Sequence, residues 1–501
     1  MTEKRERPGP LRWLRHLLDQ LLVRILSLSL FRSRCDPPPL QRFPATELPP
    51  AVAAKYVPIP RVLPVVGTLV DLIAAGGATH LHKYIDARHK QYGPIFRERL
   101  GGTQDAVFVS SANLMRGVFQ HEGYPQHPLP DAWTLYNQQH ACQRGLFFME
   151  GAEWLHNRRI LNRLLLNGNL NWMDVHIESC TRRMVDQWKR RTAEAAAIPL
   201  AESRSYELPL LEQQLYRWSI EVLCCIMFGT SVLTCPKIQS SLDYFTQIVH
   251  KVFEHSSRLM TFPPRLAQLP IWRDFEANVD EVLREGAAII DHCIRVQEDQ
   301  RRPHDEALYH RLQAADVPGD MIKRIFVDLV IAAGDFSSQW ALFALSKEPR
   351  LQQRLAKERA TNDSRLMHGL IKESLRLYPV APFIGRYLPQ DAQLGGHFIE
   401  MVLLSLYTAG RDPSHFEQPE RVLPERCIGE TEQVHKSHGS LPFAIGQRSC
   451  IGRRVALKQL LGRCTAQFEM SCLNEMPVDS VLRMVTVPDQ TLRLALRPRT
   501  E

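Results

Sequence analysis

Hydrophobic residues recur with two periods along this chain, and the helical period covers most of it. Residues 81–92 and most of residues 205–295 have apolar positions at helical spacing, with loops marked by Pro236, Pro263-Pro264 and Pro270. Two shorter runs, residues 95–102 and 106–109, have the composition of strands around a glycine turn. The pattern predicts long helices together with a small sheet near the start of the folded part.

The longest apolar segment, residues 321–345, predicts a helix with an unusual interruption. Its middle reads Ala332-Ala333-Gly334-Asp335-Phe336-Ser337-Ser338. A glycine inside a helix costs about 1 kcal/mol relative to alanine. Gly334 therefore requires a reason, and close approach of the backbone to a ligand is one.

The first 35 residues are amphipathic and rich in arginine. They hold eight Lys or Arg against three Asp or Glu, which is +5 of the formal net charge of +8. Arg24 interrupts the longest apolar run, so no stretch of the roughly 20 apolar residues that a membrane span needs is present there. These features predict a mitochondrial targeting segment over residues 1–35. A surface amphipathic anchor or a signal anchor is the alternative.

Prolines dominate the segment that follows. Residues 36–66 include Pro37-Pro38-Pro39 and Pro58-Ile59-Pro60 and end just before Gly67. Because proline fixes the backbone and opposes helix formation, this segment is expected to be a stiff hinge. We therefore expect three parts: targeting segment 1–35, hinge 36–66 and catalytic domain 67–501.

Composition excludes several classes of protein. The chain is 44% hydrophobic and 23% charged, which is typical of a globular protein. The charge outside residues 1–35 is nearly balanced and no nucleic-acid-binding motif is present, so we expect no nucleic-acid partner. The 11 cysteines include no Cys-x-x-Cys pair. A reduced compartment fits, with thiols such as Cys224 and Cys225 packed in the core.

One cysteine lies in a different setting. Residues 443–452 read Phe-Ala-Ile-Gly-Gln-Arg-Ser-Cys-Ile-Gly, so that Cys450 lies between Gly446 and Gly452 and two residues after Arg448. Glycines let the backbone approach a porphyrin face and aim amide donors at sulfur. An arginine is a natural partner for a haem carboxylate. Thiolate ligation of haem iron favours cleavage of the oxygen-oxygen bond, so the loop predicts oxygen activation.

The pattern Phe-x-x-Gly-x-Arg-x-Cys-x-Gly resembles the haem-binding loop of the cytochromes P450. It is matched at Phe443, Gly446, Arg448, Cys450 and Gly452. The resemblance implies the P450 fold, a single large haem-enclosing domain that is mainly α with a small β-rich lobe. It also implies haem b, with Cys450 as the iron ligand, and extends from about residue 58 to the C-terminus.

Further segments resemble the family's haem-binding and structural motifs. The family contacts the haem propionates from two places. The first is matched here by Trp154 and Arg158, which are one helical turn apart, and the second by Arg386 in the run Phe-Ile-Gly-Arg. Glu373 and Arg376, in a run ending Leu-Tyr-Pro, resemble the family's buried ion pair. Arg426, in Pro-Glu-Arg, would complete that set.

The distal helix departs from the family pattern. The family places a small residue, Gly, a variable residue, Asp or Glu, and then Thr over the haem, where acid and hydroxyl guide protons to oxygen. Ala333, Gly334 and Asp335 resemble that motif. Phe336 follows, where the resemblance implies threonine.

The same segment is about three residues shorter than the usual pattern when it is aligned on Trp340. Three residues are about 300° of helical rotation, which leaves the following residues out of phase by about 60°. Two interpretations remain open. Either Ser337 or Ser338 supplies the hydroxyl that acts with Asp335, or proton delivery in this chain is impaired.

The reaction class implies an electron donor, because oxygen activation consumes two electrons delivered singly. Lys372, Arg453 and Arg454 resemble the basic surface with which mitochondrial family members dock an acidic ferredoxin. The resemblance implies NADPH, ferredoxin reductase and ferredoxin as the electron path. It also implies peripheral association with the matrix side of the inner mitochondrial membrane.

Within the family the chain is most similar to insect ecdysteroid 2-hydroxylases, which implies a steroid substrate, 2-deoxyecdysone, and dioxygen as co-substrate. Two alternatives stay open. One is a microsomal P450 that works with a flavin reductase. The other is a haem-binding protein whose altered distal helix cannot activate oxygen.

Overall fold

The computed structural model describes most of the chain after the proline-rich segment. The described residues are 57–60, 67–100, 105–122, 126–128, 131–197, 205–259, 270–299, 307–332, 337–360, 365–389, 393–394, 397–428, 439–457 and 467–499. The expected targeting segment and most of the expected hinge lie outside these ranges.

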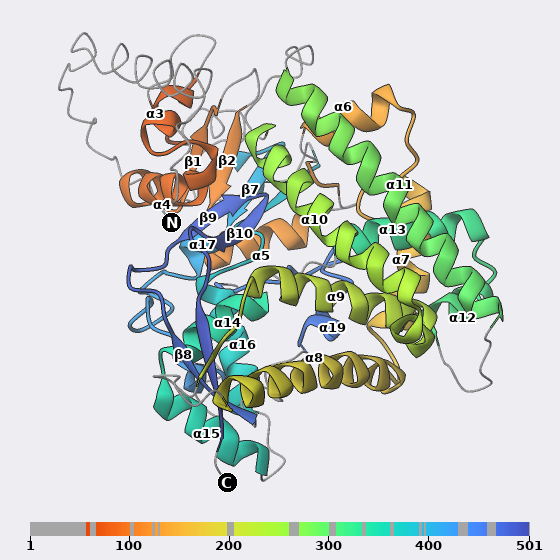
Figure 1. Ribbon diagram of the computed structural model, residues 1–501. Coiled ribbons are helices and arrows are strands. Elements are labelled where there is room, and N and C mark those ends of the chain that lie inside the picture. The colour runs from red at the N-terminus through yellow and green to blue at the C-terminus, as the bar shows by residue number, and fades with distance from the viewer. Residues whose placement is uncertain are drawn as a thin grey trace.

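Helices make up most of the described structure (Figure 1). In chain order, the helices and 3-10 turns are α3 Leu69–Ala74, η2 Ala78–His80, α4 Leu81–Tyr92, α5 Ala112–His121, α6 Asp131–Gln139, α7 Gly151–Leu165, α8 Trp172–Ala196, α9 Leu211–Phe228, η3 Thr230–Thr234, α10 Pro236–Leu259, α11 Pro270–Asp299, α12 Leu308–Gln313, α13 Gly319–Ala332, α14 Ser337–Ser346, α15 Pro349–Ala360, α16 Arg365–Leu377, α17 Leu406–Ala409, η5 Pro424–Cys427 and α19 Arg453–Leu457.

The strands form small sheets. They are β1 Ile95–Glu98, β2 Ala106–Val109, β3 Tyr206–Glu207, β4 Phe383–Tyr387, β5 Gln393–Leu394, β6 His397–Phe398, β7 Met401–Ser405, β8 Phe468–Cys472, β9 Ser480–Arg483, β10 Val485–Pro488 and β11 Leu494–Pro498. The largest described sheet has the order β1-β2-β7-β4, in which β2 and β7 are parallel and the other pairs antiparallel. With α3 and α4 it makes the β-rich lobe (Figure 1). The fold class, mainly α with a small β-rich lobe, is confirmed.

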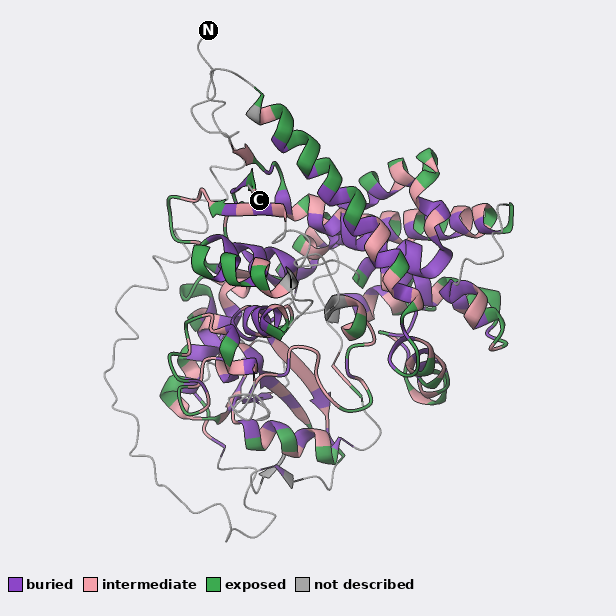
Figure 2. Cartoon of the chain, turned by 90° about the horizontal axis from the view of Figure 1, so that it is seen from below, coloured by how far each residue is buried: buried purple, intermediate pink, exposed green. Residues whose placement is uncertain are grey.

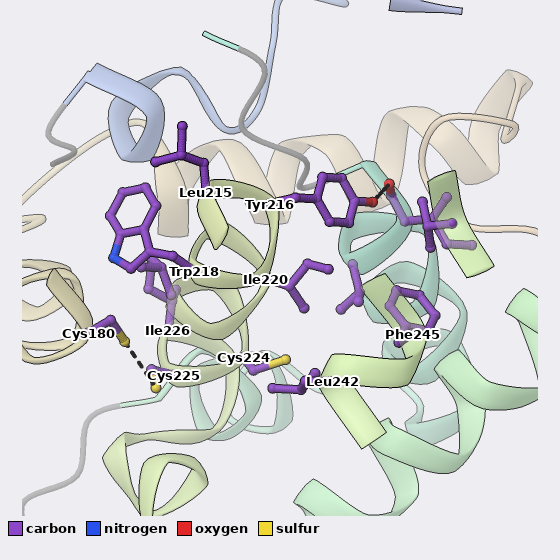
Figure 3. Close-up of a cluster of buried hydrophobic side chains, with 14 of the residues drawn as sticks. Cys180, Leu215, Tyr216, Trp218, Ile220, Cys224, Cys225, Ile226, Leu242 and Phe245 are labelled. Carbon is purple, nitrogen blue, oxygen red and sulfur yellow. Dashed lines mark hydrogen bonds between the residues drawn. The ribbon is translucent and has the colours of Figure 1, made fainter. Parts of the chain in front are cut away.

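The main core lies among the long helices, where buried residues concentrate (Figure 2). Helix α9 is at its centre, and 13 of its 18 residues are buried. Cys224 and Cys225 have no exposed surface, and the Cys180 thiol donates to Cys225 Sγ at 3.5 Å (Figure 3). The prediction that these two cysteines pack in the core is confirmed. Two smaller clusters of buried residues fill the β-rich lobe.

Helices α13 and α14 follow each other through this helical core, with residues 333–336 between them outside the described ranges. The stretch Gly319–Ser346 is apolar and long enough to cross a membrane, but 71% of its most apolar window is buried inside the protein. A core helix explains that composition. Helix α13 packs against α9 and α11.

Several predicted boundaries agree with the structure and others do not. Helix α4 and strand β2 have the predicted bounds, whereas β1 ends at Glu98, earlier than expected. Pro236 and Pro270 do not lie in loops but are the first residues of α10 and α11. Proline is tolerated in the first helical turn because the amide hydrogen that it lacks has no partner there in any case. Residues 206–207 form strand β3 rather than helix, because they pair with β11.

Candidate functional site

Residues 443–452, the cysteine loop, are folded by their own backbone. The Cys450 amide donates to the Phe443 carbonyl at 2.8 Å, and the Ser449 amide donates to the Gly446 carbonyl at 3.2 Å. Gly446 has a φ of 78°, in the region that favours glycine. A Cβ at this position would also stand 2.3 Å from Glu122 Oε1. The positive φ and the lack of room for a Cβ therefore both require glycine at position 446.

The Cys450 side chain is accessible and yet surrounded by protein. The residue is exposed, although burial is the largest influence on its thiol and raises its pKa. A backbone hydrogen bond from Gly452 and the positive charges of Arg158 and Arg453 act in the opposite direction. These donors and cations would stabilise the thiolate form once a metal ion replaces the thiol proton. The thiol is thus exposed and has beside it the amide donor and the positive charges that favour a metal-bound thiolate.

Helix α7 carries two of the expected haem-contacting residues against this loop. Arg158 is buried, and its Nη2 donates to the Ser449 carbonyl at 2.5 Å, while its Nε donates to Asn162 at 2.8 Å. Burial lowers the pKa of Arg158 to about 10, and the neighbouring Cys450 opposes this effect. Trp154 is 1% exposed. Arg158 therefore holds the backbone beside the cysteine as well as supplying positive charge.

Arg448 joins the cysteine loop to the chain just before α7. Its guanidinium lies over the Trp154 ring, 4.3 Å from the centroid, and its Nη2 donates to the Met149 carbonyl at 2.8 Å. A cation over an indole ring gains electrostatic attraction. The predicted residues Trp154, Arg158 and Arg448 are thus brought together around Cys450.

Arg386, on strand β4, is held by residues that the sequence did not reveal. Its Nε donates to Glu122 Oε2 at 2.8 Å and its Nη1 to the Gly385 carbonyl at 2.8 Å, and both charged side chains are buried. Its Nη2 is buried and finds no hydrogen-bond partner among the described residues. A buried donor without a partner costs free energy, which an acceptor on a ligand would recover.

His127 is a second residue of the site that the sequence did not indicate. Both of its ring nitrogens are buried, and neither has a partner within the described part of the chain. Burial lowers the pKa of His127 to about 3, and Arg448 and Arg386 lower it further because their charges lie nearby. The imidazole of His127, which has no hydrogen-bond partner among the described residues, thus lies near the positive charges of two arginines. No sequence signal marks Glu122, because its partner Arg386 is 264 residues away along the chain. None marks His127 either, because the arginines whose charges act on it, Arg386 and Arg448, are also far away in the sequence.

The residues present fit a haem. Cys450 offers an exposed thiol, and Gly452 offers an amide hydrogen bond to its sulfur. Arg386 and His127 offer buried polar atoms that have no hydrogen-bond partner among the described residues and could bind carboxylates. A porphyrin that carries iron and two propionates has the matching acceptors. Among the described residues no group of three or more His, Cys, Asp or Glu could hold a free metal ion.

The expected ion-paired residues lie where helix α16 meets the 3-10 turn η5. Arg376 donates to both oxygens of Glu373 at 2.7 and 2.9 Å, and Arg426 donates to Glu373 at 3.3 Å. Neither Glu373 nor Arg376 has exposed side-chain surface. Arg376 also donates to the Gly410, Pro419 and Arg421 carbonyls and therefore fixes the segment that precedes η5.

The distal residues are only partly described. Asp335 lies outside the described residues, whereas Ser337 and Ser338 begin helix α14, half-buried and buried respectively. The Tyr216 hydroxyl donates to the Ile331 carbonyl at 3.3 Å, near the end of α13. Further along α14, Trp340 stacks on Tyr378 with ring centroids 3.8 Å apart and 2° between planes. The role of the serines stays a prediction.

Two of the expected partner residues directly follow the cysteine loop, and the third lies on helix α16. Arg453 and Arg454 begin helix α19, half-buried and exposed respectively, and Lys372 is half-buried on α16. Arg453 is close enough to Cys450 to lower the pKa of its thiol. Of these three positive charges, that of Arg453 is therefore the one shown to lie close to the Cys450 thiol.

Comparison with known proteins gives a consistent result. The family model described as Cytochrome P450 matches residues 57–495. The chain is 96% identical over 520 aligned positions to "Cytochrome P450 315a1, mitochondrial" of Drosophila melanogaster, covering 100% of both chains. It is 25% identical to "Cholesterol side-chain cleavage enzyme, mitochondrial" of Oncorhynchus mykiss, over 84% of this chain and 86% of the relative. It is 28% identical to "Sterol 26-hydroxylase, mitochondrial" of Rattus norvegicus, over 87% and 88%.

The alignment with the fly protein also contains gaps. It spans 520 positions, whereas this chain has 501 residues, so at least 19 aligned positions have no residue here. The two chains differ largely through missing positions rather than substitutions.

Proposed function

The chain belongs to the cytochrome P450 family, in its mitochondrial class, and from this premise we propose that it hydroxylates 2-deoxyecdysone-type ecdysteroids at C2, with electrons from a ferredoxin. The observation that carries the proposal is the setting of Cys450, an accessible thiol enclosed by protein and flanked by Gly452, Arg158 and Arg453. The names of two relatives support a steroid as substrate. The resemblance to insect ecdysteroid 2-hydroxylases supports the choice of position.

The chain's residues would bind and orient the cofactor. Cys450 would hold the iron of haem b, and Arg386, Arg448 and His127 would pair with its carboxylates. Bound haem supplies the oxygen activation that hydroxylation of an unactivated C–H bond requires. The Gly452 amide would limit the charge on the sulfur, and Arg158 would keep the loop in place through the Ser449 carbonyl.

The rest of the site would handle protons and electrons. A hydroxyl of Ser337 or Ser338, together with Asp335, would pass protons toward the oxygen side of the haem. Lys372, Arg453 and Arg454 would meet an acidic ferredoxin, which receives its electrons from NADPH through ferredoxin reductase. Complementary charge of this kind mainly raises the association rate.

A second candidate function is haem binding with impaired oxygen activation. It is favoured by Phe336, which stands where the family has a hydroxyl, and by the aligned positions that this chain lacks. Such a protein would bind haem and steroid but consume NADPH with little product. The mitochondrial names of the relatives argue against the microsomal alternative.

The first test is the absorption spectrum of the reduced, CO-bound full-length protein. We expect a strongly red-shifted Soret band, because thiolate ligation produces it. The band should be lost in Cys450→Ala. Cys472→Ala is the matched control. Cys472 is half-buried on β8, and the hydrogen bond described for its thiol is to Asn474, outside the cysteine loop. No such band in the haem-supplied wild type would contradict the proposal.

The second test is turnover of 2-deoxyecdysone with ferredoxin, ferredoxin reductase and NADPH. The main proposal expects about one hydroxylated product per NADPH, since monooxygenation consumes two electrons. The second candidate function predicts NADPH consumption with little product. A product that lacks the C2 hydroxyl would contradict the assigned position.

A further inference from the structure

Arg144 and Asp328 form a buried ion pair between the loop before α7 and helix α13. Nε and Nη2 of Arg144 donate to Oδ1 of Asp328 at 2.9 and 2.6 Å, and the two side chains are 5% and 6% exposed. The guanidinium also lies 5.1 Å from the ring centroid of Trp133 and 4.4 Å from that of Phe148. These contacts hold the arginine in one orientation.

The backbone beside Arg144 is fixed to the same helix. The Gly145 amide donates to Asp328 Oδ2 at 2.5 Å, and Arg324 Nη2 donates to the Arg144 carbonyl at 2.8 Å. A Cβ on Gly145 would stand 2.5 Å from the Arg324 carbonyl oxygen, so only glycine allows the loop to come this near to α13. The carboxylate of Asp328 thus binds a side chain and a main chain together.

Residues 144–149, here called the linking segment, connect this pair to the cysteine loop. The Phe148 and Met149 amides both donate to the Gly145 carbonyl at 3.1 Å, which makes the segment a compact turn. At its far end the Met149 carbonyl accepts from Arg448 Nη2 at 2.8 Å. One end of the segment is therefore held by α13 and the other by the loop that carries Cys450.

Stability alone does not account for an ion pair at this place. Burial raises the pKa of Asp328, and the Arg144 charge opposes this, so the ionised carboxylate depends on its partner. Buried ion pairs contribute little net stability compared with a well-packed apolar pair, and the aromatic rings around Arg144 would accommodate such a pair. What the ion pair adds is a fixed geometry.

We propose that Arg144 and Asp328 are a positioning pair, which through the linking segment fixes helix α13 relative to the cysteine loop. Under the proposed function the haem would bind between these two elements, so the catalytic meaning of the pair rests on that function. Arg144 and Asp328 touch neither haem nor substrate in this assignment. They act through the backbone of the linking segment.

The test is amide hydrogen exchange of the full-length protein, followed by mass spectrometry. Asp328→Asn should raise exchange at least about tenfold in the linking segment and also in residues 443–452, since removing one partner of a buried pair leaves the other unpaired. Arg324→Gln is a milder second variant if Asp328→Asn fails to fold, because Arg324 is 19% exposed and acts on the same backbone. It should raise exchange in the same two regions.

Glu98→Gln is the matched control, because Glu98 is a buried carboxylate of the β-rich lobe that accepts from Tyr84 at 2.6 Å and faces Arg88. It should raise exchange in its own lobe and leave residues 443–452 unchanged. Faster exchange that stays within the linking segment in both Asp328→Asn and Arg324→Gln would overturn the proposal.

A haem readout keeps the two proposals distinguishable. In the reduced, CO-bound protein, Asp328→Asn should shift the C–O stretching frequency, which reports on the distance and polarity of the distal side, whereas Glu98→Gln should not. Failure of the proposed haem site would remove the thiolate spectrum from the wild type itself, and failure of the proposed hydroxylation would appear as NADPH consumption without product; the exchange pattern stays measurable in both cases. An unshifted frequency in Asp328→Asn would overturn the positioning role alone.

Discussion

His82 and His127 both have pKa values lowered to about 3, mainly by burial, but their surroundings differ. His82 shares a hydrogen bond with Ser480 at 3.1 Å and packs edge-on against Tyr407 at 4.8 Å. His127 has no hydrogen-bond partner among the described residues and lies near two arginines. His127 also packs edge-on, against Phe147 at 5.0 Å, and one ring nitrogen of His82, Nδ1, is likewise buried without a partner among the described residues. The difference is that His82 is tied to Ser480, whereas both ring nitrogens of His127 are available to a ligand.

The lowered pKa of His82 predicts loss of stability in mild acid. The unfolded chain takes up a proton near pH 6.5, whereas the folded chain does so only near pH 3. The stabilisation is therefore fully present above pH 6.5 and is lost as the pH falls toward 3, by about 2 kcal/mol at about pH 5. His82→Gln should show a smaller fall in unfolding free energy between about pH 7.5 and about pH 5 in urea titrations. Equal pH dependence of variant and wild type would contradict this.

At the scale of elements, one glycine lets α16 pack against η5. A Cβ on Gly369 would stand 2.3 Å from the Pro424 carbonyl oxygen. That contact places Arg426, on η5, within reach of Glu373, on α16. The buried ion pairs of the proximal side therefore depend on a residue without a side chain.

Gly369→Ala should lower the free energy of unfolding by about 1–3 kcal/mol, because the added methyl group must displace backbone. Gly319→Ala is the matched control. Gly319 begins α13 and has no atom within 4 Å of its ideal Cβ, so the change should be neutral or stabilising by up to about 1 kcal/mol. Chemical denaturation of both variants gives the comparison. The prediction is wrong if the two shift the midpoint equally.

The elements also show where sequence information was sufficient. Helix α4 was predictable because its apolar positions repeat within 12 residues, and the cysteine loop because its signal lies within ten. Pro236 was misinterpreted, since a proline at a helix start and a proline in a loop look alike in sequence. Glu122 could not be found in this way, because its partner Arg386 becomes a neighbour only after the chain has folded.

At the scale of the whole molecule, the positive charges of Lys372 on α16 and Arg454 on α19 predict how electrons are delivered under the proposed function. Lys372→Glu or Arg454→Glu should raise the KM for ferredoxin by about fivefold to tenfold, since charge reversal slows association. Wild-type reduction should slow as salt increases. Stopped-flow measurement of haem reduction at several salt concentrations tests both statements.

Arg284→Glu is the control for this surface, because Arg284 is an exposed residue of α11 that pairs with Glu281 and Glu285. Its KM for ferredoxin should equal that of the wild type. A similar rise in all three variants would mean that net charge, rather than a docking surface, controls the rate.

The stacked rings of Trp340 and Tyr378 also give this protein an optical property of its own. Two aromatic chromophores that lie parallel at 3.8 Å couple electronically, and that coupling ends when the rings separate. Trp340 belongs to α14, which begins with Ser337, and Tyr378 directly follows α16. The near-ultraviolet circular dichroism of the pair would therefore register rearrangement of the distal helix without any added label.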